Sequence, residues 1–195
     1  MSEPSLDLDQ RQSLPPEWLE PLARFPRERW REPWLDQTAA HWLMMHDAFR
    51  GHQASMARTV ADWRGGRLDL RGFHGRLIPE LQGFLQHLDG HHRIESGHYF
   101  PAFRRAEPAL AAGMDLLDRD HDRIHATLES LFQSALAFHQ ALLANAPDAR
   151  DKAQRLAEAL LSAEPPLSRH LSDEEDLVIP LLALHSSHES ETPSA

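Results

Sequence analysis

The sequence predicts an all-α fold: an antiparallel up-down four-helix bundle that follows an N-terminal arm rich in proline and tryptophan. Four segments repeat their apolar residues at helical spacing, and no segment shows the period-two alternation typical of a half-buried strand. The links between these segments are short, which favours antiparallel packing of consecutive helices. At 195 residues the chain is long enough for one domain with its own core.

Each of the four predicted helices carries an apolar face and ends near residues that interrupt helices, such as Gly65–Gly66 and Asn145–Asp148. In chain order the helices cover about residues 36–63, 73–103, 114–145 and 151–184. We expect a bend in the fourth helix at Pro165–Pro166, because a proline inside a helix removes one backbone hydrogen bond.

The two ends of the chain differ from this helical region, which we place at residues 36–185. In residues 1–35 the prolines are too dense for a long helix, so we expect an arm with short helical turns whose tryptophans pack onto the domain. Residues 186–195 are small and polar, and we expect a disordered tail there.

The bulk composition excludes several classes of function. The formal net charge is −10, which disfavours nucleic acid and anionic membranes as partners. No apolar run approaches the roughly 20 residues that span a bilayer, and the first residues lack the features of a signal peptide. We therefore expect a cytoplasmic protein. The absence of cysteine excludes disulfides, thiolate metal sites and thiol catalysis.

Histidine is unusually frequent: the chain has 14 histidines against a single tyrosine, and no consecutive run of six that would suggest a purification tag. Residues four apart on a helix lie about 40° apart, so their side chains can reach one point. Three pairs have this spacing on the predicted second, third and fourth helices: His91 with Glu95, His121 with His125, and His170 with Glu174.

These pairs are expected at one height. His46 and His91 lie at nearly equal distances along the chain from the first turn, near Leu68, and the other two pairs lie at nearly equal distances from the second turn, near Asp148. Equal counts give equal heights in antiparallel hairpins. The spacing His-x3-Glu-x5-Pro also occurs twice, beginning at His91 and at His170, which indicates a duplicated helical hairpin.

The pattern therefore predicts a two-metal centre. Imidazole nitrogens and carboxylate oxygens suit iron, manganese, zinc or copper, and two carboxylates can bridge two ions and offset part of their charge. The predicted metal ligands are His46, His91, Glu95, His121, His125, His170 and Glu174.

Two residues next to these ligands need a separate assignment. Glu175 lies about 140° from His170 on a helix, so we expect it as the alternative to Glu174 or behind the ligands, hydrogen-bonded to a ligand histidine. His92 points about 100° away from His91, and we expect it at the surface or behind a ligand.

The linked motifs resemble the hemerythrin family, specifically the HHE cation-binding domains of bacteria. The family pattern is a histidine on the first helix, then HxxxE, HxxxH, and a last histidine followed by a carboxylate. The matching residues are His46, His91 with Glu95, His121 with His125, and His170 with Glu174 or Glu175. The resemblance covers about residues 36–185. The oxygen carriers of the family place an aspartate five residues after the last histidine, whereas this chain has glutamate at the fourth and fifth positions.

The resemblance implies a non-heme, carboxylate-bridged centre of two iron ions, for which other divalent metals can substitute. Such a centre binds dioxygen or senses oxygen, iron or redox state. A sensor would signal through a protein partner, which we expect to contact the N-terminal arm. An alternative is an enzyme acting on peroxide or another small oxidant. A third interpretation is a ferritin-like metal-binding protein, since Glu95 and His98 have the Glu-x-x-His spacing of that class. The oligomeric state is left open.

Overall fold

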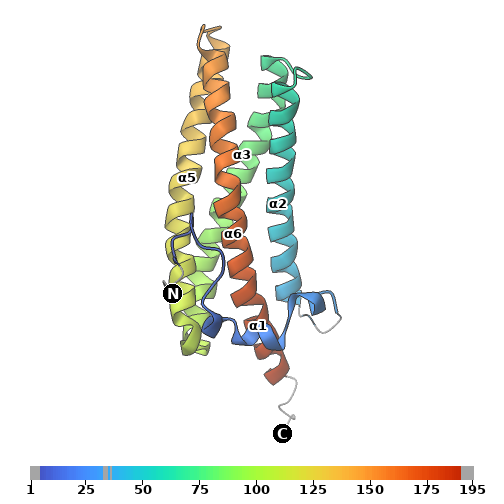
Figure 1. Ribbon diagram of the computed structural model, residues 1–195, viewed down its shortest axis with the longest axis vertical. Helices are drawn as coiled ribbons and strands as arrows, with labels where there is room; N and C mark the ends of the chain where they lie inside the picture. Colours follow the sequence, from blue (N-terminus) through green and yellow to red (C-terminus); the bar gives the residue numbers. More distant parts are fainter. Residues whose placement is uncertain (1–4, 33–34, 36, 190–195) are drawn as a thin grey trace. The chain divides into compact units, whose positions relative to one another are not determined.

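The computed structural model describes residues 5–32, 35 and 37–189, with side chains described as far as residue 184. Every regular element in these ranges is a helix, and the four long ones are α2 (Gln37–Arg64), α3 (Leu70–Ile94), α5 (Ala111–Leu143) and α6 (Ala149–Glu189) (Figure 1). The shorter ones are η1 (Pro16–Trp18), α1 (Glu20–Arg24), η2 (Arg27–Arg29), the π-helix η3 (Glu95–Tyr99), α4 (Phe100–Ala106) and η4 (Pro108–Leu110). The prediction of an all-α fold is therefore confirmed, whereas the up-down four-helix arrangement of the whole chain stays a prediction.

Two of the predicted helices differ in extent from the observed ones. The second continues from α3 through the π-helix into α4 and ends at Ala106. The fourth, α6, is not interrupted at Pro165–Pro166 and continues to Glu189. Of the tail predicted over residues 186–195, residues 186–189 thus belong to α6, and residues 190–195 lie outside the described residues. No helix in the described part of the chain is long and apolar enough to cross a membrane.

Two units divide the chain, and the long helices contribute to both. Unit 1 consists of residues 1–47, 95–120 and 168–195, and unit 2 consists of residues 48–94 and 121–167. The boundaries fall inside α2, α5 and α6 and at the junction of α3 with η3, so helical backbone continues without a break at each of them.

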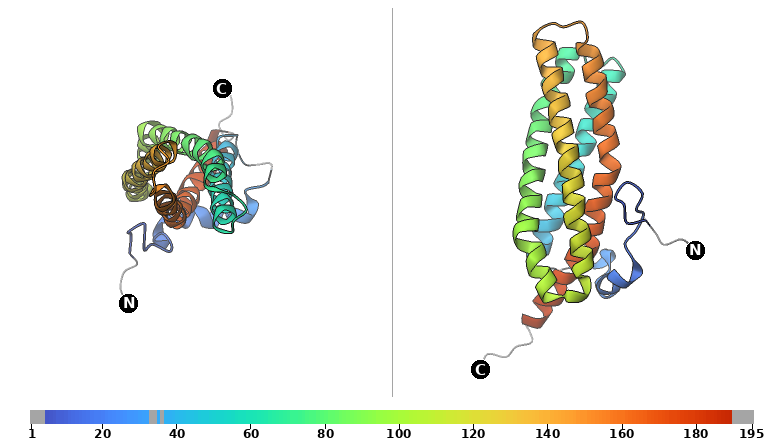
Figure 2. Two further views of the ribbon diagram at one scale, coloured as in Figure 1. Left: turned by 90° about the horizontal axis from the view of Figure 1, so that it is seen from above. Right: turned by 90° about the vertical axis from the view of Figure 1, so that its left-hand side faces the viewer.

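In unit 2, four helical segments lie side by side, and two turns join them in pairs (Figure 2). The first turn follows α2 and places Gly66 at a φ of 75°, in the left-handed region that favours glycine. The second follows α5 and places Asn145 at a φ of 48°, a conformation that asparagine tolerates better than most residues. Both turns therefore use residues suited to ending a helix.

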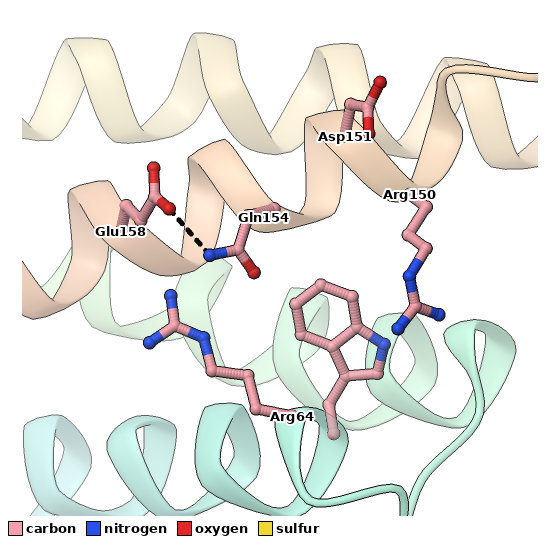
Figure 3. A pocket seen from close by; sticks show the side chains of 6 residues that line it. Arg64, Arg150, Asp151, Gln154 and Glu158 are labelled. Carbon is pink, nitrogen blue, oxygen red and sulfur yellow. Dashed lines mark hydrogen bonds between the residues drawn. The ribbon is translucent and has the colours of Figure 1, made fainter.

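Aromatic contacts join the helices near these turns. The Trp63 ring of α2 stacks on Phe73 of α3 with 4.5 Å between the ring centroids, and Phe73 contacts Phe138 of α5 at 5.8 Å. Arg150 of α6 lies over the Trp63 ring, 5.6 Å from its centroid. Beside this contact is a groove of about 670 Å³ (Figure 3), lined by Trp63, Arg64, Arg150, Asp151, Gln154 and Glu158. The groove has no histidine, so it is not where the predicted ligands gather.

In unit 1, residues of the N-terminal arm are part of the hydrophobic core. Leu14 and Trp30 of the arm are 2% and 7% exposed and belong to the same buried cluster as Trp42 of α2, Met114 of α5 and Leu177 of α6. Trp18 packs against this cluster, whereas Trp34 lies outside the described residues. The arm is therefore built into the packing of unit 1.

Replacing Phe73 with alanine should lower the free energy of unfolding by about 3–5 kcal/mol, because the ring is fully buried and its loss leaves a cavity. The matched control is Leu143→Ala at a side chain that is 65% exposed, which should change stability by no more than about 0.5 kcal/mol. Urea denaturation followed by circular dichroism measures both. Equal effects of the two substitutions would contradict the described packing.

Candidate metal centre

Glu174 of α6 lies at the centre of a buried group of titratable residues in unit 1. Its Oε1 atom is 3.5 Å from Nε2 of His46, and its Oε2 atom is 3.2 Å from Nε2 of His170. The indole Nε1 of Trp42 donates a hydrogen bond of 2.6 Å to Oε1. His46, His170 and Glu174 are 0% exposed. The two oxygens of one carboxylate thus face two different imidazoles.

Glu95 brings a second carboxylate into this group. It is the first residue of the π-helix η3 and is only 1% exposed. His46, Glu95 and Glu174 each offer a ligand atom, and these atoms lie within 4.8 Å of one another. π-helical turns occur frequently at functional sites, and here one begins at the residue that enters the group.

The electrostatics of the group favour a bound cation. Burial, together with the neighbouring charge of Glu174, raises the pKa of Glu95 well above its ordinary value. Burial also works to raise the pKa of Glu174, but His46 and His170 outweigh it and hold that pKa well below its ordinary value. Burial opposes protonation of His46, yet Glu174 and Glu175 outweigh it and raise its pKa from 6.5 to about 9. Two buried carboxylates thus depend on positive charge beside them, which protons or metal ions can supply.

The outer nitrogen of each imidazole contacts a further carboxylate. Nδ1 of His46 lies 3.0 Å from Oε1 of Glu175, and Nδ1 of His170 lies 3.5 Å from Oδ2 of Asp120. Both rings therefore turn Nε2 toward Glu174 and Nδ1 toward an acidic side chain. Carboxylates in this position orient metal-binding histidines and make their inner nitrogen a better ligand.

Unit 2 has three buried or half-buried histidines of its own on α3 and α5 that belong to the family pattern or lie next to it. The rings of His92 and His121 are stacked 4.0 Å apart at an interplanar angle of 11°, and each residue is 6% exposed. They offer ligand nitrogens within 4.8 Å of each other. His91 is half-buried, with its ring 5.1 Å from that of Phe49.

Chain continuity links these histidines to the residues of unit 1. His91 lies one helical turn before Glu95, and His92 lies three residues before it, in helical backbone that continues from α3 into η3. On α5, His121 directly follows Asp120.

The structure departs from the expected ligand set at one pair of residues. The side chain of His125 is 63% exposed, and its Nδ1 lies 3.1 Å from Oδ1 of Asp89, so it does not join the buried groups. His92, which the sequence placed at the surface or behind a ligand, is buried beside His121 instead. His98 is exposed, so it does not form a ferritin-like pair with Glu95.

The apolar stripes of the two helices indicate that His92 is buried and His125 is exposed. On α3 the stripe of residues three and four apart continues from the apolar residues into His92 and Glu95, and on α5 it includes His121 but passes His125. The fully or nearly buried members are Phe73, Leu77, Leu81, Phe84, Leu88 and His92 on α3 with Glu95 at the start of η3, and Leu117, His121, Ile124, Leu128 and Leu131 on α5. The HxxxH spacing on α5 predicts His125 as a ligand, whereas the apolar stripe predicts that it lies outside the buried face.

Of the two carboxylates behind the histidines, the sequence predicts Glu175 but not Asp120. The sequence predicts Glu175 either as a ligand or behind a ligand histidine, and in the structure it lies against the Nδ1 atom of His46. Asp120 was not among the expected residues, and the only signal for it is that it precedes His121.

Comparison with known proteins adds an independent finding. A family model described as the hemerythrin HHE cation binding domain matches residues 37–182. Searches of curated proteins and of solved structures give no match. The matched range covers all four long helices except the last residues of α6, and it includes every histidine and glutamate of the buried groups. The chain therefore belongs to the hemerythrin HHE cation-binding domain family.

Proposed function

We propose that this protein holds two iron ions in a centre of imidazoles and carboxylates, and that the ferrous centre binds dioxygen or senses it. The observation that carries the proposal is the position of Glu174, whose two oxygens face His46 and His170 separately. A carboxylate placed in this way is suited to bridge two metal ions. Each ion would then take one of the two imidazole Nε2 atoms.

The remaining ligands of the proposed centre are assigned from the buried groups. His46, His91, Glu95 and Glu174 would hold one ion, and His92, His121 and His170 would hold the other. The set draws on α2, α3 with η3, α5 and α6, and metal binding would therefore fasten the predicted up-down four-helix bundle. His125 is not included, because it is exposed and paired with Asp89.

The donor set suits iron without requiring it. Imidazoles add no charge, and two carboxylates offset part of the charge of two divalent ions. Seven protein ligands do not fill the coordination of two six-coordinate ions, which leaves room for a small ligand. Because the residues around Glu174 are almost fully buried, we expect a small ligand such as dioxygen or peroxide to reach them and larger substrates to be excluded. Zinc and copper bind such donors at least as tightly as iron does, so supply decides which metal is found.

Metal analysis of the anaerobically loaded protein should give two ions per chain, and His92→Ala should lower the stoichiometry or the affinity because it removes a buried donor. The matched control is His125→Ala at the exposed histidine on α5, which should keep both ions. Elemental analysis after removal of free iron measures both variants. Loss of metal in His125→Ala with full retention in His92→Ala would overturn the ligand assignment.

Removing the metal with a chelator should lower the melting temperature. A ligand that binds only the folded protein stabilises it by about 2.7 kcal/mol at a free concentration 100 times its dissociation constant. Calorimetry of the loaded and metal-free proteins measures the shift, and acid should release the metal as the histidines take up protons. If the two forms melt at the same temperature, the ligands do not fasten the helices to one another.

Adding dioxygen to the anaerobic ferrous protein should produce a visible absorption band that disappears under vacuum. Reversal is expected because a carrier or sensor retains the ligand without consuming it. Steady consumption of dioxygen or added peroxide, followed with an electrode, would instead support the enzyme alternative. Zinc-loaded protein is the control and should give neither signal, since zinc has no redox chemistry.

A further inference from the structure

Arg11 of the N-terminal arm is a buried cation between two helices of unit 1. Its side chain is 0% exposed. Nε donates a hydrogen bond of 2.8 Å to Oδ2 of Asp173 on α6, and the two Nη atoms contact the carboxylate of Asp120 on α5. Nη1 also donates to the carbonyl oxygen of Leu6 at 2.8 Å, which ties the guanidinium to its own segment. The arm thus delivers a fixed positive charge to both acidic residues.

Arg27, from the short helix η2, makes a second contact of the same kind. Nε donates to Oδ1 of Asp176 at 2.7 Å, and Nη1 donates to Oε2 of Glu175 at 3.1 Å. Nη2 donates to the carbonyl oxygen of Ser172 at 2.8 Å, and the guanidinium lies 4.9 Å from the centroid of the Trp30 ring. Three contacts to α6 and a packed face fix the orientation of this side chain.

Both arginines act on carboxylates that touch the proposed ligands. The Arg11 partner Asp120 lies against Nδ1 of His170, and the Arg27 partner Glu175 lies against Nδ1 of His46. Two parallel series of contacts therefore run from the arm to the Nε2 atoms that face Glu174. Each series has the same order of groups: guanidinium, carboxylate, imidazole.

A third arginine of the arm shows what a purely local ion pair looks like in this segment. Arg29 pairs with Glu32 at 2.9 Å, both residues belong to the arm, and their side chains are 50% and 44% exposed. The side chain of Arg27 is also 41% exposed, but Arg27 and Arg11 direct their donors at carboxylates of α5 and α6 that contact histidines. Fastening the arm alone would not require those particular carboxylates.

We propose that the N-terminal arm positions the metal ligands, with Arg11 acting through Asp120 on His170 and Arg27 acting through Glu175 on His46. This inference rests on the proposed metal centre. Outer hydrogen-bond partners of metal-binding histidines typically change metal affinity by about 10- to 100-fold when they are removed. An arginine that fixes such a partner acts one step further out, so its loss should weaken binding within that range or below it.

Coupling of this kind is reciprocal. If docking of the arm strengthens metal binding, metal binding strengthens docking of the arm by the same free energy. The protection of the arm's backbone amides from hydrogen exchange then depends on whether metal is bound.

The test compares Arg11→Met and Arg27→Met with the matched control Arg29→Met. Methionine keeps an unbranched apolar stem and removes the guanidinium. Each chain is loaded anaerobically with ferrous iron alone, and the dissociation constants are measured by competition with a chelator. We expect about 3- to 100-fold weaker binding of one ion in each of the first two variants, and no change in the control. Unchanged constants in both variants would overturn the inference.

A double-mutant cycle separates positioning from general stability. In a Glu175→Ala background, Arg27→Met should have little further effect on iron binding, because the carboxylate that joins Arg27 to His46 is already absent. A merely structural role of Arg27 would give the same loss of affinity in both backgrounds, and that result would overturn the inference for this arginine.

Hydrogen exchange on the wild-type protein keeps the proposal testable if Arg11→Met does not fold. Amides of residues 5–32 should exchange more slowly in the iron-loaded than in the metal-free protein, relative to amides near Phe73, which serve as an internal reference. Equal exchange of the arm in the two forms would overturn the coupling. The two proposals fail differently: a wild-type protein that binds no iron contradicts the proposed function, whereas normal iron binding that is insensitive to the arm contradicts only this inference.

Discussion

The burial of Glu174 is the constraint on which the described site depends. A carboxylate loses its hydration when it enters a protein core, and only charge and hydrogen bonds around it can compensate. Here the compensation extends outward in layers: imidazoles face Glu174, carboxylates face the imidazoles, and guanidinium groups face those carboxylates. Each layer lowers the free-energy cost of burying the next one, so replacing one of these residues affects the others.

The sequence predicted the helices well, because apolar periodicity over long segments is a strong signal. It predicted the inner residues His46, Glu95, His170 and Glu174, which the structure gathers in unit 1, from i, i+4 spacing and counting from the turns. It does not separate His92 from His125, because motif spacing favours His125 as a ligand and the apolar stripe favours His92. Where two local patterns conflict, burial decides, and burial depends on neighbours that are distant in the chain.

The arm shows what could not be predicted from spacing. Arg11 meets Asp173 across a separation of 162 residues, and no periodic pattern connects them. From sequence alone, an arginine among prolines and acidic residues is expected to be solvated. The packing of Leu14 and Trp30 instead brings this segment into the core. The family match begins at residue 37, so these arginines lie outside the region that the chain shares with its family. Properties specific to this chain are therefore to be sought in the arm.

The π-helix η3 has a consequence for how length variation can be tolerated near the site. Glu95 and Phe100 are both buried although they lie five positions apart, a separation that an α-helix would turn about 140° away from a common face. The wider π-helical turn accommodates one extra residue, so the side chains before it and the side chains after it can face the same core. Deleting one residue within Glu95–Tyr99 would leave Glu95 and Phe100 four positions apart, about 40° on an α-helix, so a regular helix could replace the wider turn and keep both residues on one face. The short segment thus acts as a phase adjustment between the ligand-bearing half of the helix and the half that packs against the arm.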